Sequence, residues 1–313
     1  MVLPPYKGAV FRGAFGNSFK RLVCIAHRAD CSSCSFRERC LYISIFEAPP
    51  PQGYIDAAKF SQAPRPYVLN APLISRQSFQ PGETLEFHLV LLGPAIEALP
   101  HFIHCFIEMG RRGLGRQRGK YELLQVGLIK NGATIPGYES STHTLTNVAP
   151  DSGPKYLPED DQTTALTLEF LTPLRLKDKG DLVSRFSFPF FFECLSRRLS
   201  VLAAFYGDSD QLPNFASLSD AAQGVNVVQT RLCWFDWERY SRRQHAAMKF
   251  GGLQGRVRLA GKLGPFMPYL RLGSQVNVGE KTTFGLGRYE LLYDRELGSS
   301  AIANKVSASA TPQ

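Results

Sequence analysis

The sequence predicts an α+β protein made of two tandem halves, each with helices and strands in a βαββαβ-like order. Three observations lead to this prediction. The tetrapeptide GLGR occurs at 113–116 and at 285–288, and both copies run into Tyr-Glu-Leu-Leu, which begins at Tyr121 and at Tyr289. The order of helical and strand patterns before the first copy returns before the second. The chain has 313 residues, whereas single cores usually stop growing near about 250 residues.

In the first half, the spacing of apolar residues defines the elements. Residues 6–24 place Phe15, Phe19 and Leu22 at helical spacing, so they predict a helix. Short apolar runs bounded by turn residues predict strands at 40–46, 65–74, 83–93 and 120–129, with a helix at 95–110 between the last two.

The second half repeats this order. We expect a strand at 165–176, a helix at 189–207, strands at 227–237 and 252–261, a helix at 266–276, and a strand at 289–294 after the second GLGR turn. Residues 131–163 are rich in Gly, Pro, Ser, Thr and Asp and suit a linker or a surface excursion. The expected domains are therefore 1–130 and 164–297, followed by a flexible tail at 298–313.

Composition and charge restrict the functional classes. Hydrophobic residues make up 44% of the chain, but no run of eighteen apolar residues and no signal sequence appears, so we expect a cytoplasmic protein without a membrane partner. The net charge of +9 is unevenly distributed. One acid-free stretch holds Arg111, Arg112, Arg116, Arg118 and Lys120, and a second basic stretch holds Arg239, Arg242, Arg243 and Lys249. Such clusters favour a phosphate backbone as partner, although a solvated surface without a partner is an alternative.

Four cysteines give the strongest metal signal. Cys24, Cys31, Cys34 and Cys40 follow the pattern C-x6-C-x2-C-x5-C on a short polar stretch. In a protein without a secretory signal this pattern favours a structural zinc site over disulfides, with an iron–sulfur cluster or free thiols as alternatives. The other three cysteines, Cys105, Cys194 and Cys233, lie in apolar contexts and are expected to be buried.

His27 is the candidate general base. It follows the first predicted helix by one short turn and lies near Lys20, Arg21 and Arg28 in sequence. An imidazole there can take a proton from a ribose 2′-hydroxyl, while nearby cations stabilise the charge that develops on the phosphate. Two alternatives stay open: His27 is a zinc ligand between Cys24 and Cys31, or it is an ordinary surface residue.

The stretch GEKTTFGLGR is the candidate phosphate loop. Its glycines Gly279, Gly285 and Gly287 would let backbone amides approach phosphates, with further contacts from Lys281, Thr282, Thr283 and Arg288. The Walker spacing is absent, so it is not a nucleotide-binding P-loop. A tight β-turn without a ligand is the alternative.

Together these stretches resemble a known family. FRGAFGNSFKRLVC, CSSCSFRERCLY, LEFLTPLRLKDKGDLV, YSRRQHAAMKFGGLQGRVRLAG and VGEKTTFGLGRYEL are similar, in this order, to the CRISPR repeat-processing endoribonucleases of the RAMP superfamily, the sixth Cas family. The resemblance implies two ferredoxin-like (RRM-like) domains, binding of CRISPR repeat RNA, and cleavage without a metal to a cyclic phosphate and a 5′-hydroxyl. Only ten residues precede FRGAFG, so the first domain is expected to lack its first strand.

The resemblance also defines the expected site. His27, Lys20 and Arg21 are the catalytic candidates. Relatives often carry histidine where this chain has Asn17 and Asn277, so the alternative is an inactive guide-RNA-binding subunit that works with other Cas proteins of an effector complex. The expected RNA-binding residues are Arg12, Arg28, Arg111, Arg112, Arg116, Arg118, Lys120, Arg242, Arg243, His245, Lys249, Asn277, Lys281, Thr282, Thr283, Phe284, Gly285, Gly287 and Arg288.

Overall fold

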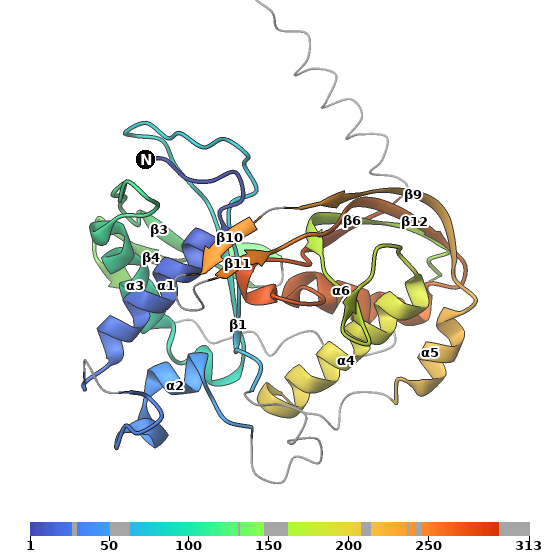
Figure 1. Cartoon of the computed structure of the whole chain (residues 1–313), viewed down its shortest axis with the longest axis horizontal. Helices are drawn as coiled ribbons and strands as arrows, with labels where there is room; N and C mark the ends of the chain where they lie inside the picture. Colours follow the sequence, from blue (N-terminus) through green and yellow to red (C-terminus); the bar gives the residue numbers. More distant parts are fainter. Residues whose placement is uncertain are drawn as a thin grey trace, which may run out of the picture. The chain divides into compact units, whose positions relative to one another are not determined.

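The protein is a mixed α/β chain whose contacts divide it into two units (Figure 1). The computed structural model describes residues 1–26, 30–50, 63–130, 132–146, 162–207, 214–236, 238–241 and 246–293. The first unit comprises Met1–Lys155 with Val201–Asp208, and the second comprises Tyr156–Ser200 with Ser209–Gln313. All strand pairs are antiparallel in the described residues. Within them, no helix is both long and apolar enough to cross a membrane.

The second unit is built on a βαββαβ motif, of which only the end of α4, Val201–Tyr206, is counted with the first unit. In chain order its elements are β6 (Ala165–Leu174), α4 (Phe188–Tyr206), β9 (Asn226–Phe235), β12 (Gly252–Ala260), α6 (Met267–Val276) and β13 (Tyr289–Leu292). The strands lie side by side in the order β13-β6-β12-β9, which is the ferredoxin-like arrangement. All six elements were predicted from the sequence, and their existence and type are confirmed.

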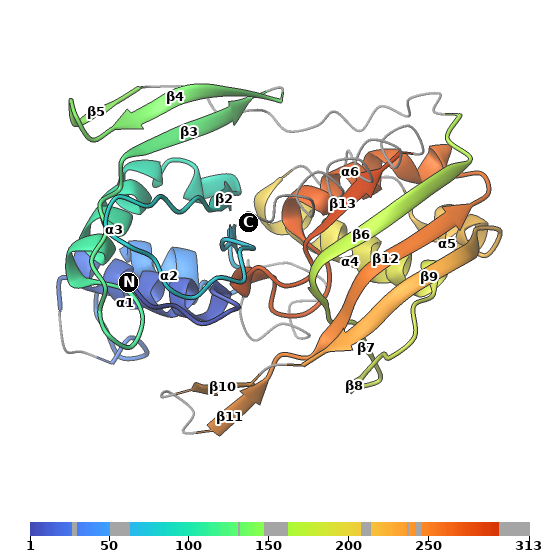
Figure 2. The ribbon, with the colours of Figure 1, turned by 90° about the horizontal axis from the view of Figure 1, so that it is seen from above.

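Helices cover only one face of this sheet (Figure 2). Leu166, Leu168 and Phe170 alternate along β6 and are buried, as expected for one face of a strand. The Phe170 ring centroid lies 5.7 Å from that of Phe191 in α4 and 5.9 Å from that of Tyr289 in β13. The apolar side chains of β6 therefore face the helices, and its alternate residues face away from them.

Several short elements of the second unit were not predicted. They are the hairpin of β7 (Lys177–Asp178) with β8 (Asp181–Leu182), the helix α5 (Ala216–Ala222), and the hairpin of β10 (Glu238–Ser241) with β11 (Ala246–Lys249). These segments are too short or too polar to give a periodic apolar signal.

The first unit is built around a cluster of aromatic rings. Its elements are α1 (Gly8–Val23), α2 (Leu41–Phe46), β1 (Tyr67–Asn70), β2 (His88–Leu91) and α3 (Leu99–Arg112). Helices α1 and α3 lie side by side (Figure 1). Phe15 of α1 sits at the centre, with its ring centroid 5.3–5.6 Å from five neighbouring rings: Phe19, Phe46, Tyr67, Phe102 and Phe106. The predicted helices at 6–24 and 95–110 are confirmed.

The predicted strand at 40–46 is wrong, because Leu41–Phe46 forms the helix α2. A helical turn brings Tyr42 and Phe46 to the same side of the backbone, where their rings stack with centroids 5.0 Å apart. Phe46 also packs against Phe15 and Phe19 in the core. Packing of the aromatic core thus overrides the β propensity of the two isoleucines, Ile43 and Ile45.

Sheet organisation differs between the two units. In the first, β1 and β2 form a two-stranded sheet, and β3 (Gln125–Lys130), β4 (Ala133–Glu139) and β5 (Thr144–Leu145) form a separate three-stranded sheet. The strands β4 and β5 lie within the range expected as a linker. The described residues of the first unit therefore do not form one four-stranded sheet. Residues 1–3 pair with 77–79 instead, through Leu3 N to Gln77 O and Phe79 N to Met1 O, both 2.8 Å.

The two Tyr-Glu-Leu-Leu copies share one contact. The Tyr121 hydroxyl donates a hydrogen bond to the Phe106 carbonyl of α3 at 2.8 Å, and the Tyr289 hydroxyl donates to the Leu270 carbonyl of α6 at 2.7 Å. In each case a helix glycine makes room: a Cβ on Gly110 would lie 3.0 Å from the Tyr121 ring, and one on Gly273 would lie 2.3 Å from the Tyr289 hydroxyl. Burial raises the pKa of both phenols. Both tyrosines thus anchor the segment after a GLGR turn to the preceding helix.

Candidate active site and nucleic-acid contacts

The last turn of α1 carries two of the three catalytic candidates. The Lys20 Nζ lies 5.2 Å from the centroid of the Tyr42 ring, within range for a cation–π contact. A hydrogen bond with the Cys31 side chain is the largest cause that raises the pKa of Lys20. Arg21, one position on, is exposed. His27 and Arg28 lie outside the described residues.

Arg12 lies on the same side of α1 as Lys20, two turns earlier. Its guanidinium carbon is 5.2 Å from the centroid of Phe46. A Cβ on Gly16 would lie 2.6 Å from Arg12 Nη1, so glycine at this position makes room for the guanidinium group. The α1–α2 basic face is thus formed by Arg12, Lys20, Tyr42, Phe46 and Arg65.

Three members of the α1–α2 basic face were missed from the sequence: Tyr42, Phe46 and Arg65. Burial lowers the pKa of Arg65, and the charge of Arg12 beside it acts in the same direction. Burial raises the pKa of Tyr42, and Glu47 contributes further. Tyr42 lies in the segment 40–46, which was wrongly predicted to be a strand. Nothing in the sequence indicated that its ring would lie close to Lys20. Arg65 stands just before a strand, in a position that is ordinary for a solvated cation.

The four cysteines of the predicted zinc site are all partly exposed. Within the described residues, no three His, Cys, Asp or Glu side chains lie close enough together to hold one metal ion. Zinc at Cys24, Cys31, Cys34 and Cys40 therefore stays a prediction. Instead, Arg37 Nη1 donates to the Cys31 carbonyl at 2.8 Å and ties the middle of this stretch.

The remaining cysteines divide into two kinds. Cys105 and Cys194 are buried as predicted, and burial raises the pKa of the Cys105 thiol to about 12. The prediction for Cys233 is wrong, because it is exposed on β9. β9 ends the order β13-β6-β12-β9, so it has only one strand neighbour in this sheet.

The first GLGR copy forms a basic turn, which we define as residues 111–120. Leu114 and Gly119 exchange two hydrogen bonds of 2.8 and 2.9 Å, and Leu114 is buried beneath them. Gly113 has φ +81°, and a Cβ there would lie 2.2 Å from the Arg118 carbonyl oxygen. The fold thus requires glycine at this corner. All five predicted cations are exposed: Arg111, Arg112, Arg116, Arg118 and Lys120.

The second GLGR copy is held by hydrogen bonds to β6. Thr172 Oγ1 donates to the Gly285 carbonyl at 2.8 Å and accepts from the Arg288 amide at 2.9 Å. The Gly287 amide donates to the Pro173 carbonyl at 3.0 Å. Gly285 and Phe284 amides donate to Thr282 and Lys281 carbonyls. Four amides of the loop are thus bonded within the protein, and they include those of Gly285 and Gly287 from the predicted phosphate loop.

Side chains of this loop differ in their access to solvent. Gly285, Gly287 and Thr282 are buried, whereas Lys281, Thr283, Phe284 and Arg288 are partly exposed. Lys281 Nζ lies 5.0 Å and the Phe284 ring 5.3 Å from the Phe250 ring centroid. Arg288 Nη2 is 3.7 Å from Glu290 Oε1. The atoms of this loop that reach solvent therefore belong mainly to its longer side chains.

Asn277 is fully buried, which does not favour a direct RNA contact. Its side-chain amide donates to the Leu286 carbonyl at 3.2 Å. Arg198 Nε donates to the Asn277 carbonyl at 2.7 Å, and Nη2 donates to the Val276 carbonyl at 2.6 Å, so this cation satisfies the last carbonyls of α6. Burial lowers the pKa of Arg198 to about 10. Arg242, Arg243 and His245 lie outside the described residues, and Lys249 is described only as backbone of β11.

Comparisons with known proteins follow the same division of the chain. Residues 168–289 match the family described as CRISPR-associated endoribonuclease Cas6, and residues 1–149 match a family described as an N-terminal domain. An uncharacterized protein of Archaeoglobus fulgidus is 26% identical over 294 residues, 92% of each chain. A Cas6 product complex from Thermus thermophilus has a TM-score of 0.54 and 18% identity, covering 93% of this chain and 95% of that one. At this identity, the likeness to the solved structure is one of fold alone.

Proposed function

We propose that the protein binds CRISPR repeat RNA and cleaves it to guide RNA, because residues 168–289 match the family described as CRISPR-associated endoribonuclease Cas6. Exposed cations suitable for a phosphate backbone are present on the basic turn 111–120. The observation that carries the catalytic part is the position of Lys20, whose Nζ is 5.2 Å from the Tyr42 ring centroid in the last turn of α1, seven residues before the candidate base.

The proposed reaction is an internal displacement at phosphorus. His27 takes the proton of a ribose 2′-hydroxyl, the 2′-oxygen bonds to the adjacent phosphorus, and the bond to the 5′-oxygen breaks. The products are a 2′,3′-cyclic phosphate and a 5′-hydroxyl, whose proton comes from the protonated His27 or from water. Lys20 and Arg21 stabilise the negative charge on the phosphate oxygens. A raised pKa suits Lys20 to this electrostatic role, since it keeps its proton throughout.

A cleavage assay tests this proposal. Repeat RNA incubated with the protein in EDTA should give one discrete cut with a cyclic phosphate end, and the all-deoxy version should not be cut. His27→Ala should abolish the cut, whereas His104→Ala, which removes an exposed histidine of α3, should not. An unchanged rate for His27→Ala would overturn the residue assignment. Tight binding without any cut over hours would instead support the non-catalytic guide-RNA-binding subunit.

We also infer that the two units descend from one duplicated ferredoxin-like domain. The matching contacts of Tyr121 with α3 and Tyr289 with α6 support this inference, because both follow a GLGR turn. A structural zinc ion at the four cysteines is a separate proposal. Measuring the zinc content of the purified protein tests it.

A further inference from the structure

The strand β9 lies at one edge of the four-stranded sheet of the second unit (Figure 2). Nine of its ten residues are exposed, and the tenth, Leu232, is partly exposed. Among the described residues, no strand pairs with the outer edge of β9. The main-chain N–H and C=O groups along this edge can therefore accept a further strand.

The exposed side chains of β9 are unusually apolar for a sheet edge. Val227, Val228, Trp234 and Phe235 are between 38% and 55% exposed. Edge strands are usually protected by charged residues, by proline or by their short length. β9 has ten residues, no proline and a single charged residue, Arg231. A long apolar edge of this kind indicates a site of association.

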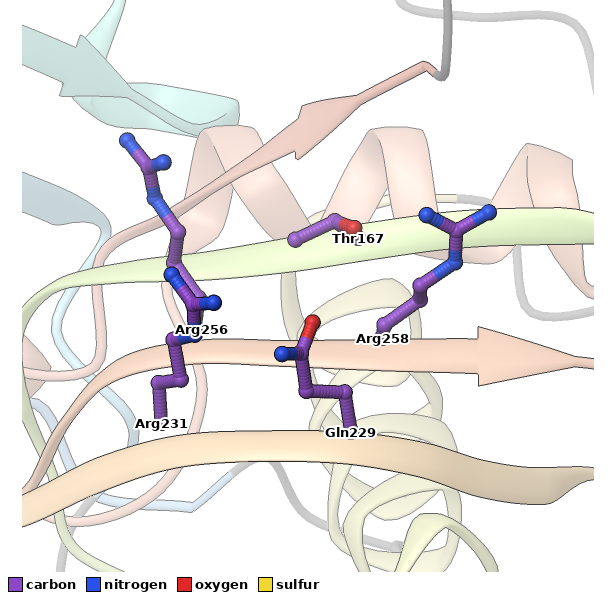
Figure 3. A pocket seen from close by; sticks show the side chains of 5 residues that line it. All are labelled: Thr167, Gln229, Arg231, Arg256 and Arg258. Atoms are coloured by element: carbon purple, nitrogen blue, oxygen red, sulfur yellow. The ribbon is translucent and has the colours of Figure 1, made fainter. Parts of the chain in front are cut away.

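The side chains of β9 alternate between the two faces of the sheet from Gln229 onward. Gln229 and Arg231 lie on the face without helices, where Figure 3 shows them beside arginines of β12. Thr230 is opposite a buried residue of β12, so it lies on the face that carries the helices. Leu232 and Trp234 follow on that face by alternation. The edge therefore presents apolar side chains beside the helix-covered core of the sheet.

We propose that β9 pairs in antiparallel fashion with β9 of a second copy of this chain, which joins two four-stranded sheets into one. The pairing with β12 shifts by one residue between Val227 and Gln229, so the regular part of the edge runs from Gln229 to Phe235. Its midpoint is Leu232. Two such edges overlap along their full regular length only when the pair is centred on Leu232. This association goes beyond the proposed function and does not depend on it.

The side chains that meet in this register suit one another. A two-fold axis at the centre makes each contact twice. An aromatic side chain faces a β-branched one, and the single cation faces a neutral thiol, whereas a pair centred on Arg231 would place that cation opposite itself. The resulting pairs, each with one residue from either copy, are Leu232 with Leu232, Thr230 with Trp234, Arg231 with Cys233, and Gln229 with Phe235.

Sedimentation velocity of the full chain without RNA tests the association. At tens of micromolar, the wild type should have the mass of two chains. Leu232→Lys places two lysines opposite each other at the centre of the pair and should have the mass of one chain. The matched control is Ile129→Lys, which changes a 63% exposed residue of β3, the end strand of another sheet. This control should keep the mass of two chains.

Disulfide trapping tests the register. Arg231→Cys places a thiol directly opposite Cys233 of the second copy, so mild oxidation should give a covalent dimer on a non-reducing gel. Adding Cys233→Ser to this variant should abolish the covalent dimer. Gln229→Cys places its thiol two residues further along the same face, too far from Cys233 for a disulfide, and should be trapped much less.

Three outcomes overturn the proposal. The first is a wild type with the mass of one chain at these concentrations, which would leave the edge to a partner of different sequence. The second is a dimer that Leu232→Lys leaves intact. The third is efficient trapping in Gln229→Cys but not in Arg231→Cys, which would place the strands in another register. If Leu232→Lys does not fold, the trapping experiment decides alone.

Discussion

Lys20 illustrates what a single residue contributes at the candidate active site. Its neighbours, Tyr42 and Cys31, come from segments that follow α1 in the chain, so only the folded protein brings them to it. The hydrogen bond with Cys31 raises the pKa of Lys20, so the ammonium keeps its charge up to and beyond the pH where lysine usually loses it.

This fixes the pH dependence expected of cleavage. The rate should rise with pH through about 6.5, as an ordinary histidine base loses its proton, and should then stay level past pH 9. Lys20→Ala should lower the plateau of the cleavage rate by about a hundredfold without moving the pH at the midpoint of the rise. Lys20→Arg, which keeps the charge, should retain more of the rate. Single-turnover rates across the pH range measure both; a loss of affinity with no loss of rate would contradict the assigned role.

At the scale of the element, the glycine loop depends on main-chain contacts that tolerate no side chain at Gly287. Its φ is +70°, and an added Cβ would lie 1.8 Å from the Val278 carbonyl oxygen. Val278 cannot easily shift away to relieve this contact, because its own amide donates a hydrogen bond of 3.0 Å to the Gly287 carbonyl.

Gly287→Ala should therefore lower the free energy of unfolding by at least about 2 kcal/mol, from backbone strain plus the clash. Gly180 is the matched control, since its φ is +100° but nothing lies within 4 Å of an added Cβ. Gly180→Ala should cost only the backbone strain, about 1 kcal/mol. Urea denaturation of both variants gives the comparison. Equal losses would show that the close approach to Val278 is relieved by a small shift of the loop.

Elements also show where sequence reasoning succeeds and where it fails. The six main elements of the second unit were predicted because each has a long apolar pattern with one period. The six-residue helix α2 was not, since an alternating apolar run of that length fits a strand equally well until the aromatic core decides. For the glycine loop, the sequence indicated a tight turn, but the direction of its amides depends on Thr172 and Pro173, more than a hundred residues earlier.

For the whole molecule, the net charge of +9 would favour the approach of the proposed RNA partner. The basic turn 111–120 belongs to the first unit, and its five cations are all exposed. The sequence predicted the basic turn from five cations without an intervening acid, whereas the arginines of β9 and β12 stand among apolar residues and gave no such signal.

The contribution of the basic turn is measurable from the salt dependence of RNA binding. Arg116→Ala, Arg118→Ala should weaken repeat binding and make the salt slope shallower by about 1.4. Arg185→Ala, which changes an exposed arginine of the second unit, should not. Filter binding at several salt concentrations gives both quantities. If the double variant binds like the wild type, this GLGR copy serves the fold alone.

The inward direction of the glycine-loop amides has a consequence for how this protein diversifies. Four amides of the loop are bonded within the protein, so its shape is encoded by glycines and by Thr172 rather than by the residues that reach solvent. Lys281, Thr283 and Arg288 can then be exchanged in evolution while the loop keeps its course. Relatives that bind a different repeat RNA should therefore differ at these three positions and keep the glycines.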